Sequence, residues 1–155
     1  MHVDNNNLGE LYQSAYKKHH STETALLKVQ DDILRAIDNN CCVILLLLDL
    51  SAAFDTVDHC ILLDRLSERF GITGNALEWF RSYLSNRHQV VRVDGHQSTS
   101  REVRCGVPQG SVLGPILFLL YTSPLGDVMR FHHVKCHLYA DDTQIYLNFE
   151  SSPDS

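Results

Sequence analysis

The sequence predicts an α+β fold in which helices interleave with a few mostly antiparallel strands. Apolar residues recur at helical spacing in several segments, whereas residues 43–50 form a run of strand length that is apolar except for Asp49. Two further apolar runs, 134–139 and 145–147, flank the adjacent pair Asp141-Asp142. That arrangement is typical of a β-hairpin with the two carboxylates at its tip. The length of 155 residues and the 44% hydrophobic content are sufficient for one domain with a real core.

The first half of the chain predicts a polar lead-in segment, a helix and a strand. Residues 1–10 are mostly polar and predict a lead-in segment. Ser21 or Thr22 is a suitable N-cap for a helix that Asn39-Asn40 ends. The apolar face of that helix would consist of Leu26, Val29, Ile33 and Ile37. The run 43–50 then predicts a strand buried on both faces.

The second half alternates helices with hairpins. Helices are expected over 61–70, with Gly71 as the C-terminal stop, and over 75–84. Residues 89–93 and 98–104 predict a hairpin with Asp94-Gly95 in its turn. A loop over 106–110 leads into an apolar helix over 111–121, and the hairpin that carries the aspartate pair follows.

Asp49 is the first candidate partner of the aspartate pair. It lies at the end of the apolar strand, where a buried carboxylate is costly unless it is paired or binds a metal. A helix N-cap is the alternative role for Asp49. Two strands of one sheet would bring Asp49 close to Asp141 and Asp142. Carboxylates are the ligands that hard divalent cations prefer, and paired aspartates at strand ends build two-metal phosphoryl-transfer sites.

Other polar residues have a structural and a functional interpretation. The loop Gly106-Val107-Pro108-Gln109-Gly110-Ser111 could approach a nucleotide closely, or could be an ordinary turn. Asp55 and Asp58 are expected to face a helix N-terminus, and His59 is expected to be structural. His132, His133, Cys136 and His137 fit no standard zinc spacing, so packing or exposure is the default for them.

Composition narrows the function classes. The formal net charge of −6 argues against a free-standing nucleic-acid-binding protein with a basic face. The five cysteines are odd in number and the opening residues are polar, so we expect reduced thiols in an intracellular protein of the cytoplasm or nucleus that is not secreted. The longest apolar runs are too short to span a bilayer, which predicts no membrane association.

Four segments, in order, resemble the motifs of a LINE-type (non-LTR) retrotransposon reverse transcriptase. Residues 46–59, Leu-Leu-Leu-Asp-Leu-Ser-Ala-Ala-Phe-Asp-Thr-Val-Asp-His, resemble motif A. Residues 106–115, Gly-Val-Pro-Gln-Gly-Ser-Val-Leu-Gly-Pro, resemble motif B, and Tyr-Ala-Asp-Asp at 139–142 resembles motif C. Residues 13–24 resemble the fingers motif, although the family often has Gly-Phe-Arg where this chain has Ala15-Tyr16-Lys17.

The resemblance implies an RNA-directed DNA polymerase with a right-hand architecture. It assigns residues 1–40 to part of the fingers, 41–149 to a palm whose antiparallel sheet packs against helices, and 150–155 to a polar tail, with the thumb absent. The implied partners are an RNA template, a DNA primer and a dNTP, together with the missing thumb and endonuclease regions of the parent element.

The resemblance also implies the residue roles. Asp49, Asp141, Asp142 and the backbone carbonyl of Leu50 would hold two Mg²⁺ ions, for which Mn²⁺ could substitute. A second set would contact nucleotide or template: Phe54, which would reject a ribose 2′-OH, and Gln109, Gly110 and Lys17.

Three readings of the function follow from these residues. The first is a reverse transcriptase domain that transfers nucleotides but, as a fragment, has weak or no activity alone. The second is an inactive retroelement remnant that binds nucleic acid or a partner protein. The third is a metal-dependent nuclease that uses the same carboxylates, for which the Pro108-Gln109-Gly110 loop has no evident use.

Overall fold

The computed structural model describes residues 2–6 and 8–150, which fall into two compact units. Unit 1 contains residues from 1–8 and 52–121, and unit 2 contains residues from 9–51 and 122–155. Each unit therefore combines segments that are distant in the sequence. The assignment of 1–40 to fingers and 41–149 to palm stays a prediction. Glu150 ends a strand, and the rest of the expected polar tail lies outside the described residues.

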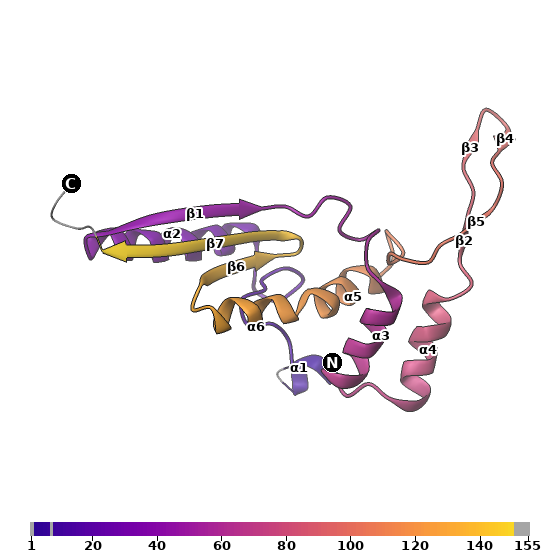
Figure 1. The fold of residues 1–155 in the computed structure, drawn as a ribbon, viewed down its shortest axis with the longest axis horizontal. Coiled ribbons are helices and arrows are strands. Elements are labelled where there is room, and N and C mark those ends of the chain that lie inside the picture. The colour runs from indigo at the N-terminus through magenta and orange to yellow at the C-terminus, as the bar shows by residue number, and fades with distance from the viewer. Residues whose placement is uncertain (1, 7, 151–155) are drawn as a thin grey trace. The chain divides into compact units, whose positions relative to one another are not determined.

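Unit 2 is built on a three-stranded antiparallel sheet (Figure 1). Its strands are β1 (Cys41–Leu48), β6 (Lys135–Tyr139) and β7 (Asp142–Glu150), in the order β1-β7-β6. Helix α2 (Thr22–Asp38) packs against β1 and β6, and α6 (Pro124–Phe131) packs against β6. The predicted hairpin around the aspartate pair is confirmed, whereas α6 was not anticipated from the sequence.

Helix α2 begins where the sequence predicts but buries a different face. Ser21 is the N-cap, and its hydroxyl accepts a hydrogen bond from the Thr24 N–H at 3.2 Å. The buried residues of α2 are Ala25, Val29 and Ala36, whereas Leu26 is 58% exposed. Small side chains let the helix approach the sheet closely. The predicted face is therefore wrong at the exposed Leu26 and Ile37, whereas Val29 is buried and Ile33 partly buried.

The prediction that the first strand is buried on both faces is also wrong. β1 has the predicted location, but it is the edge strand of its sheet, and Ile44 and Leu47 are 58% and 66% exposed. An apolar run of strand length indicates a strand that favours burial, but it does not supply the partner that would cover it. Asp49 is exposed as well, so its carboxylate has no burial cost to offset.

A short segment before α2 extends the sheet beyond β6. Gln13 forms a parallel bridge with Leu138, whose N–H donates to the Tyr12 carbonyl at 2.9 Å and whose carbonyl accepts from the Ser14 N–H at 2.9 Å. The Ser14 hydroxyl lies 2.9 Å from Nε2 of His137 and 3.0 Å from Nδ1 of His20. His137 is therefore buried, and its contact with Ser14 is one of the polar contacts that hold this segment.

Unit 1 is mainly helical and encloses a separate core. Its helices are α1 (His2–Asn5), α3 (His59–Glu68), α4 (Gly74–Leu84) and α5 (Leu113–Thr122, whose last residue belongs to unit 2). The side chains of Leu62, Leu66 and Phe70 are almost completely buried, as the sequence predicts. Gly71 ends the α3 segment with φ +64°, a conformation that glycine adopts without strain. Val3 of α1 belongs to this core, so the expected polar lead-in contributes to packing.

The predicted second hairpin is present in unit 1 as two short ladders. β3 (Arg92–Val93) pairs with β4 (His96–Gln97), and β2 (His88–Gln89) pairs with β5 (Arg101–Glu102). Asp94 and Gly95 both have positive φ, +48° and +79°, which is typical of a two-residue hairpin turn whose twist matches its strands.

The core of unit 1 gives a stability prediction. Leu66→Ala removes a completely buried side chain, and we expect it to lower the free energy of unfolding by about 2–5 kcal/mol because a cavity remains. Ile61→Ala is the matched control in the same helix. Its side chain is 42% exposed, so we expect a cost of about 1 kcal/mol or less. Chemical denaturation of both variants checks this, and equal losses would contradict the assignment of the core.

The buried imidazole of His137 gives a pH prediction. Burial, followed by the nearby Lys28 and His20, lowers the pKa of His137 below its usual range. As the pH falls below about 6.5, the unfolded chain takes up a proton that the folded chain does not, so the stability present above that pH is lost. We expect His137→Gln to reduce the loss in unfolding free energy between pH 7.5 and pH 5.5. Exposed His96→Gln should leave it unchanged, and identical pH profiles for His137→Gln and the unsubstituted chain would contradict the prediction.

Candidate metal and nucleotide site

Three predicted carboxylates lie at one end of the unit 2 sheet. The β1–β7 ladder ends with Leu48 opposite Thr143, so one further step in the same register places Asp49 opposite Asp142. Asp142 is the first residue of β7 and pairs with Tyr139, the last residue of β6. Asp141 lies in the intervening turn. The pairing of the strands therefore gathers residues that are far apart in the sequence, as predicted.

The turn that carries Asp141 has an unusual backbone. Only Ala140 and Asp141 separate Tyr139 from Asp142, and Ala140 has φ +56°. A residue with a Cβ atom is disfavoured in this region by about 1–2 kcal/mol. The side chain of Gln13 lies against this residue. Its Oε1 accepts from the Ala140 N–H at 2.9 Å, and its Nε2 donates to the Ala140 carbonyl at 3.3 Å.

The carboxylates of Asp49, Asp141 and Asp142 are chemically suited to Mg²⁺, but they do not point to one common position. No three His, Cys, Asp or Glu side chains among the described residues form a group that could hold a metal. Successive residues near a strand end point in different directions, which separates the carboxylates of Asp141 and Asp142. Asp142 lines a pocket of about 140 Å³ beside the first turns of α2. Because Asp49 and Asp142 are exposed, rotation of their side chains needs no repacking of the core.

The predicted nucleotide-contacting residues Phe54, Gln109 and Gly110 belong to unit 1. In this unit the last residues of motif A run beside the first residues of motif B. The Val107 N–H donates to the Phe54 carbonyl at 2.8 Å, and the Gly106 N–H donates to the Val57 carbonyl at 2.7 Å. A Cβ atom at Gly106, which has φ +85°, would lie 2.9 Å from the Asp55 Cα. Glycine at 106 is therefore needed for this close approach of two backbones.

Phe54 and Gln109 have specific partners within unit 1. The Phe54 ring stacks on Phe118 with centroids 4.9 Å apart and remains partly exposed. The amide of exposed Gln109 donates to Asp55 Oδ1 at 2.9 Å. The prediction that Asp55 faces a helix N-terminus is therefore wrong, because this carboxylate links motif A to motif B. Asp58, by contrast, is confirmed as the N-cap of α3 through the Ile61 N–H.

His59 and Lys17 both contact main-chain carbonyls. Nε2 of His59 lies 2.8 Å from the Gly106 carbonyl oxygen, in keeping with the structural role predicted for it. Lys17 belongs to unit 2, and its Nζ donates to the Glu10 carbonyl at 2.6 Å. This contact gives Lys17 a structural role, and a role towards nucleic acid stays a prediction.

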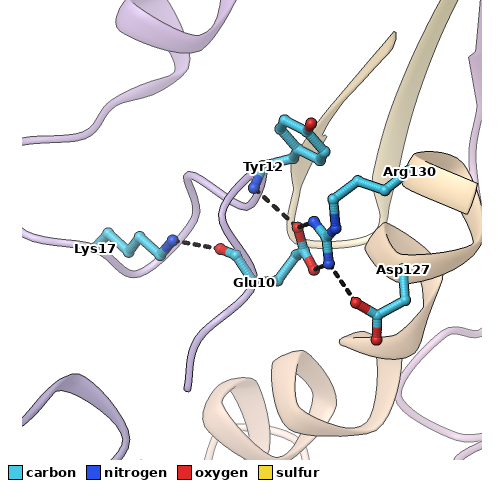
Figure 2. A network of polar contacts seen from close by, with 5 residues as sticks. All are labelled: Glu10, Tyr12, Lys17, Asp127 and Arg130. Atoms are coloured by element: carbon cyan, nitrogen blue, oxygen red, sulfur yellow. Dashed lines mark hydrogen bonds and ion pairs between the residues drawn. The ribbon is translucent and has the colours of Figure 1, made fainter. Parts of the chain in front are cut away.

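An ion-pair network anchors the segment that contains Gln13 and Lys17 (Figure 2). Glu10 has a side chain only 3% exposed and binds Arg130 of α6 through two hydrogen bonds of 2.7 and 3.0 Å. Asp127 also accepts from Arg130, and the Tyr12 N–H donates to Glu10 at 3.1 Å. The hydrogen bonds that Arg130 donates to Glu10 raise the pKa of Arg130. A side chain at Gly126 would overlap the Glu10 carboxylate.

The histidine and cysteine residues near β6 do not form a zinc site in the described part of the chain. Burial raises the pKa of the Cys136 thiol to about 11, which keeps it protonated and unreactive at neutral pH. His132 caps α6 and packs edge-on against Phe131, and His137 is bound to Ser14. All five cysteines are free, in agreement with the predicted reduced thiols.

The sequence interpretation missed three residues that shape this end of unit 2. Gln13, Glu10 and Arg130 have no local pattern that marks them, because each acts through a partner more than 100 residues away. A buried polar contact between distant segments has no signature in either segment alone. The described residues also contain no helix long and apolar enough to cross a membrane.

Comparisons with known proteins identify the family of the chain. The model of the family "Reverse transcriptase (RNA-dependent DNA polymerase)" matches residues 2–153. Three Drosophila melanogaster proteins are similar to the chain. They are the RNA-directed DNA polymerase from mobile element jockey (32% identical, 90% of this chain and 16% of the relative), the probable polymerase from transposon X-element (35%, 84% and 14%) and that from transposon BS (33%, 78% and 13%).

A solved structure is similar to the chain in fold. The structure of apo telomerase from Candida tropicalis superposes with a TM-score of 0.59 at 17% identity, and the match covers 91% of this chain and 30% of the telomerase chain. At this identity the match is evidence for the fold alone, and it supports the predicted α+β class. The chain spans 13–16% of the length of the three insect relatives. On the family match over nearly its whole length, and on those relatives, this chain belongs to the reverse transcriptase family, in its LINE-type (non-LTR) branch.

Proposed function

We propose that this chain contributes the catalytic carboxylates of an RNA-directed DNA polymerase, which extends a DNA primer with dNTPs on an RNA template. The observation that carries the proposal is the β1–β7–β6 pairing. It brings Asp49, Asp141 and Asp142 to one end of a sheet in a chain that belongs to the reverse transcriptase family. Family membership alone does not indicate where the carboxylates lie in this chain. The strand pairing supplies that observation.

In this proposal Asp49, Asp141, Asp142 and the Leu50 carbonyl hold two divalent ions, Mg²⁺ or, as a substitute, Mn²⁺. Ions held there would stabilise the attacking primer 3′-oxygen and the departing pyrophosphate. The carboxylates need to be ionised for this role, and the exposure of Asp49 and Asp142 keeps them hydrated and free to turn towards the ligand. Asp141 is half-buried in the turn and directly follows Ala140, whose φ is positive.

Four further residues would contact the substrate: Phe54, Gln109, Gly110 and Lys17. Phe54 is rigid because it stacks on Phe118, which suits a side chain that excludes a ribose 2′-OH. Gln109 and Gly110 would contact the nucleotide and template from the motif B loop. The amide of Gln109 donates one hydrogen bond to Asp55, and its side chain has a second N–H and a carbonyl oxygen that could contact a substrate. Lys17 would lie towards nucleic acid or triphosphate.

The proposal also covers the partners, the cellular location and the activity of the chain alone. The thumb, the endonuclease and other regions of a longer parent polypeptide would be its partners, in the cytoplasm or nucleus. Alone, the chain would have weak activity or none. The nuclease alternative uses the same carboxylates, and its product distinguishes it, since a nuclease shortens nucleic acid whereas a polymerase extends a primer.

Removal of one carboxylate tests metal binding. We expect Asp141→Asn to weaken Mn²⁺ binding by at least about 10-fold, because cation affinity depends on the number of charged oxygen ligands. Calorimetry or Mn²⁺ electron paramagnetic resonance measures the affinity. Asp94→Asn is the matched control, since Asp94 is an exposed aspartate in a different hairpin turn. Equal Mn²⁺ affinities for Asp141→Asn and the unsubstituted chain would contradict the proposed metal site.

Primer extension tests the reaction. With an RNA template, a DNA primer, dNTPs and Mg²⁺, we expect this chain to add at most a few nucleotides, and we expect Asp49→Asn to abolish that addition. Gel analysis of a labelled primer and a labelled template reads both products at once. Long processive products would contradict weak activity of the chain alone. Cleavage of either strand that Asp49→Asn abolishes would favour the nuclease instead.

A further inference from the structure

Both polar atoms of the Gln13 side chain, Oε1 and Nε2, bind the turn of the Tyr-Ala-Asp-Asp motif. Oε1 accepts from the N–H groups of Ala140 and Ala15, at 2.9 and 2.8 Å, and Nε2 donates to the Ala140 carbonyl at 3.3 Å. Because two N–H donors face one end of the amide and a carbonyl faces the other, the partners determine its orientation. Gln13 is only 4% exposed, so water does not replace these bonds easily.

These bonds fix the conformation of one residue. The N–H and the carbonyl of Ala140 belong to the two peptide planes on either side of its Cα, and Gln13 binds both of them. Holding the two planes sets φ and ψ of Ala140, which otherwise favours a conformation with negative φ. The direction of the chain as it leaves Ala140 determines where Asp141 begins, and therefore where its carboxylate can reach.

The segment that carries Gln13 is itself anchored on both sides. Tyr12 and Ser14 bond to the backbone of Leu138 in β6, and Glu10 is bound to Arg130 of α6 (Figure 2). Gln13 therefore lies in a segment that is held on both sides by contacts outside the turn. A glutamine on an unanchored segment could satisfy the same atoms without restraining them.

We propose that Gln13 is a positioning residue for Asp141, which acts by locking Ala140 in its positive-φ conformation. The proposal deepens the proposed function and rests on it, because positioning matters only if Asp141 binds metal. Gln13 and Ala140 are 127 residues apart in the sequence, so their contact joins the fingers-like motif to motif C.

Amide hydrogen exchange measured by NMR tests the hold directly. In Gln13→Ala we expect the Ala140 amide to exchange at least about 10-fold faster, while the amide of Ile145 inside β7 keeps its protection. Gln13→Glu retains an oxygen for the Ala140 and Ala15 N–H groups but loses the donor to the Ala140 carbonyl, so we expect it to restore only part of the protection. Gln30→Ala, at an exposed position of α2, is the matched control.

Mn²⁺ affinity tests the consequence. We expect Gln13→Ala to weaken Mn²⁺ binding on the order of 10-fold, as the loss of a residue that orients a ligand does, with partial recovery in Gln13→Glu. Unchanged exchange at Ala140 in Gln13→Ala would overturn the proposal. So would unchanged Mn²⁺ affinity in a chain whose affinity falls with Asp141→Asn. If Asp141→Asn itself has no effect, the proposed metal site fails, and the positioning role fails with it, whereas the exchange result still reports the contact between Gln13 and the turn.

Discussion

The antiparallel pairing of β7 with both β1 and β6 is the constraint on which the candidate site depends. β7 lies between the other two strands, so its register fixes where motif A ends relative to motif C. A slip of one residue would move Asp49 away from Asp142 and would also exchange the two faces of the strand. The backbone ladder, and not any attraction between the carboxylates, brings like charges to one end of the sheet against their mutual repulsion.

A second constraint comes from a buried ion pair. Glu10 is almost completely enclosed, and its two hydrogen bonds to Arg130 compensate for the loss of hydration that an enclosed carboxylate suffers. Arg130 is bidentate here, a geometry that lysine could not provide. Gly126 leaves the space that the carboxylate occupies. Together these residues fasten the segment before α2 to α6, and the turn of motif C gains its support through that segment.

Short-range features of the fold could be predicted from the sequence, and long-range contacts could not. Ser21 marks the start of α2 and Gly71 marks the stop of α3, because caps and stops depend on a few neighbouring residues. The resemblance to motifs A, B and C predicted the gathering of the carboxylates. The exposure of Leu47 was missed because apolar character does not identify a covering partner, and Gln13 was missed because the atoms that it binds lie in a distant segment.

The exposed edge strand has a consequence for the behaviour of the polypeptide in solution. β1 is Cys-Cys-Val-Ile-Leu-Leu-Leu-Leu and, among the described residues, is an edge strand of its sheet with exposed apolar side chains. Such an edge is a template for pairing with the same strand of another molecule, and natural sheets usually protect it with charge, proline or a covering segment. An apolar edge of this kind favours association between chains, which increases with the concentration of the chain.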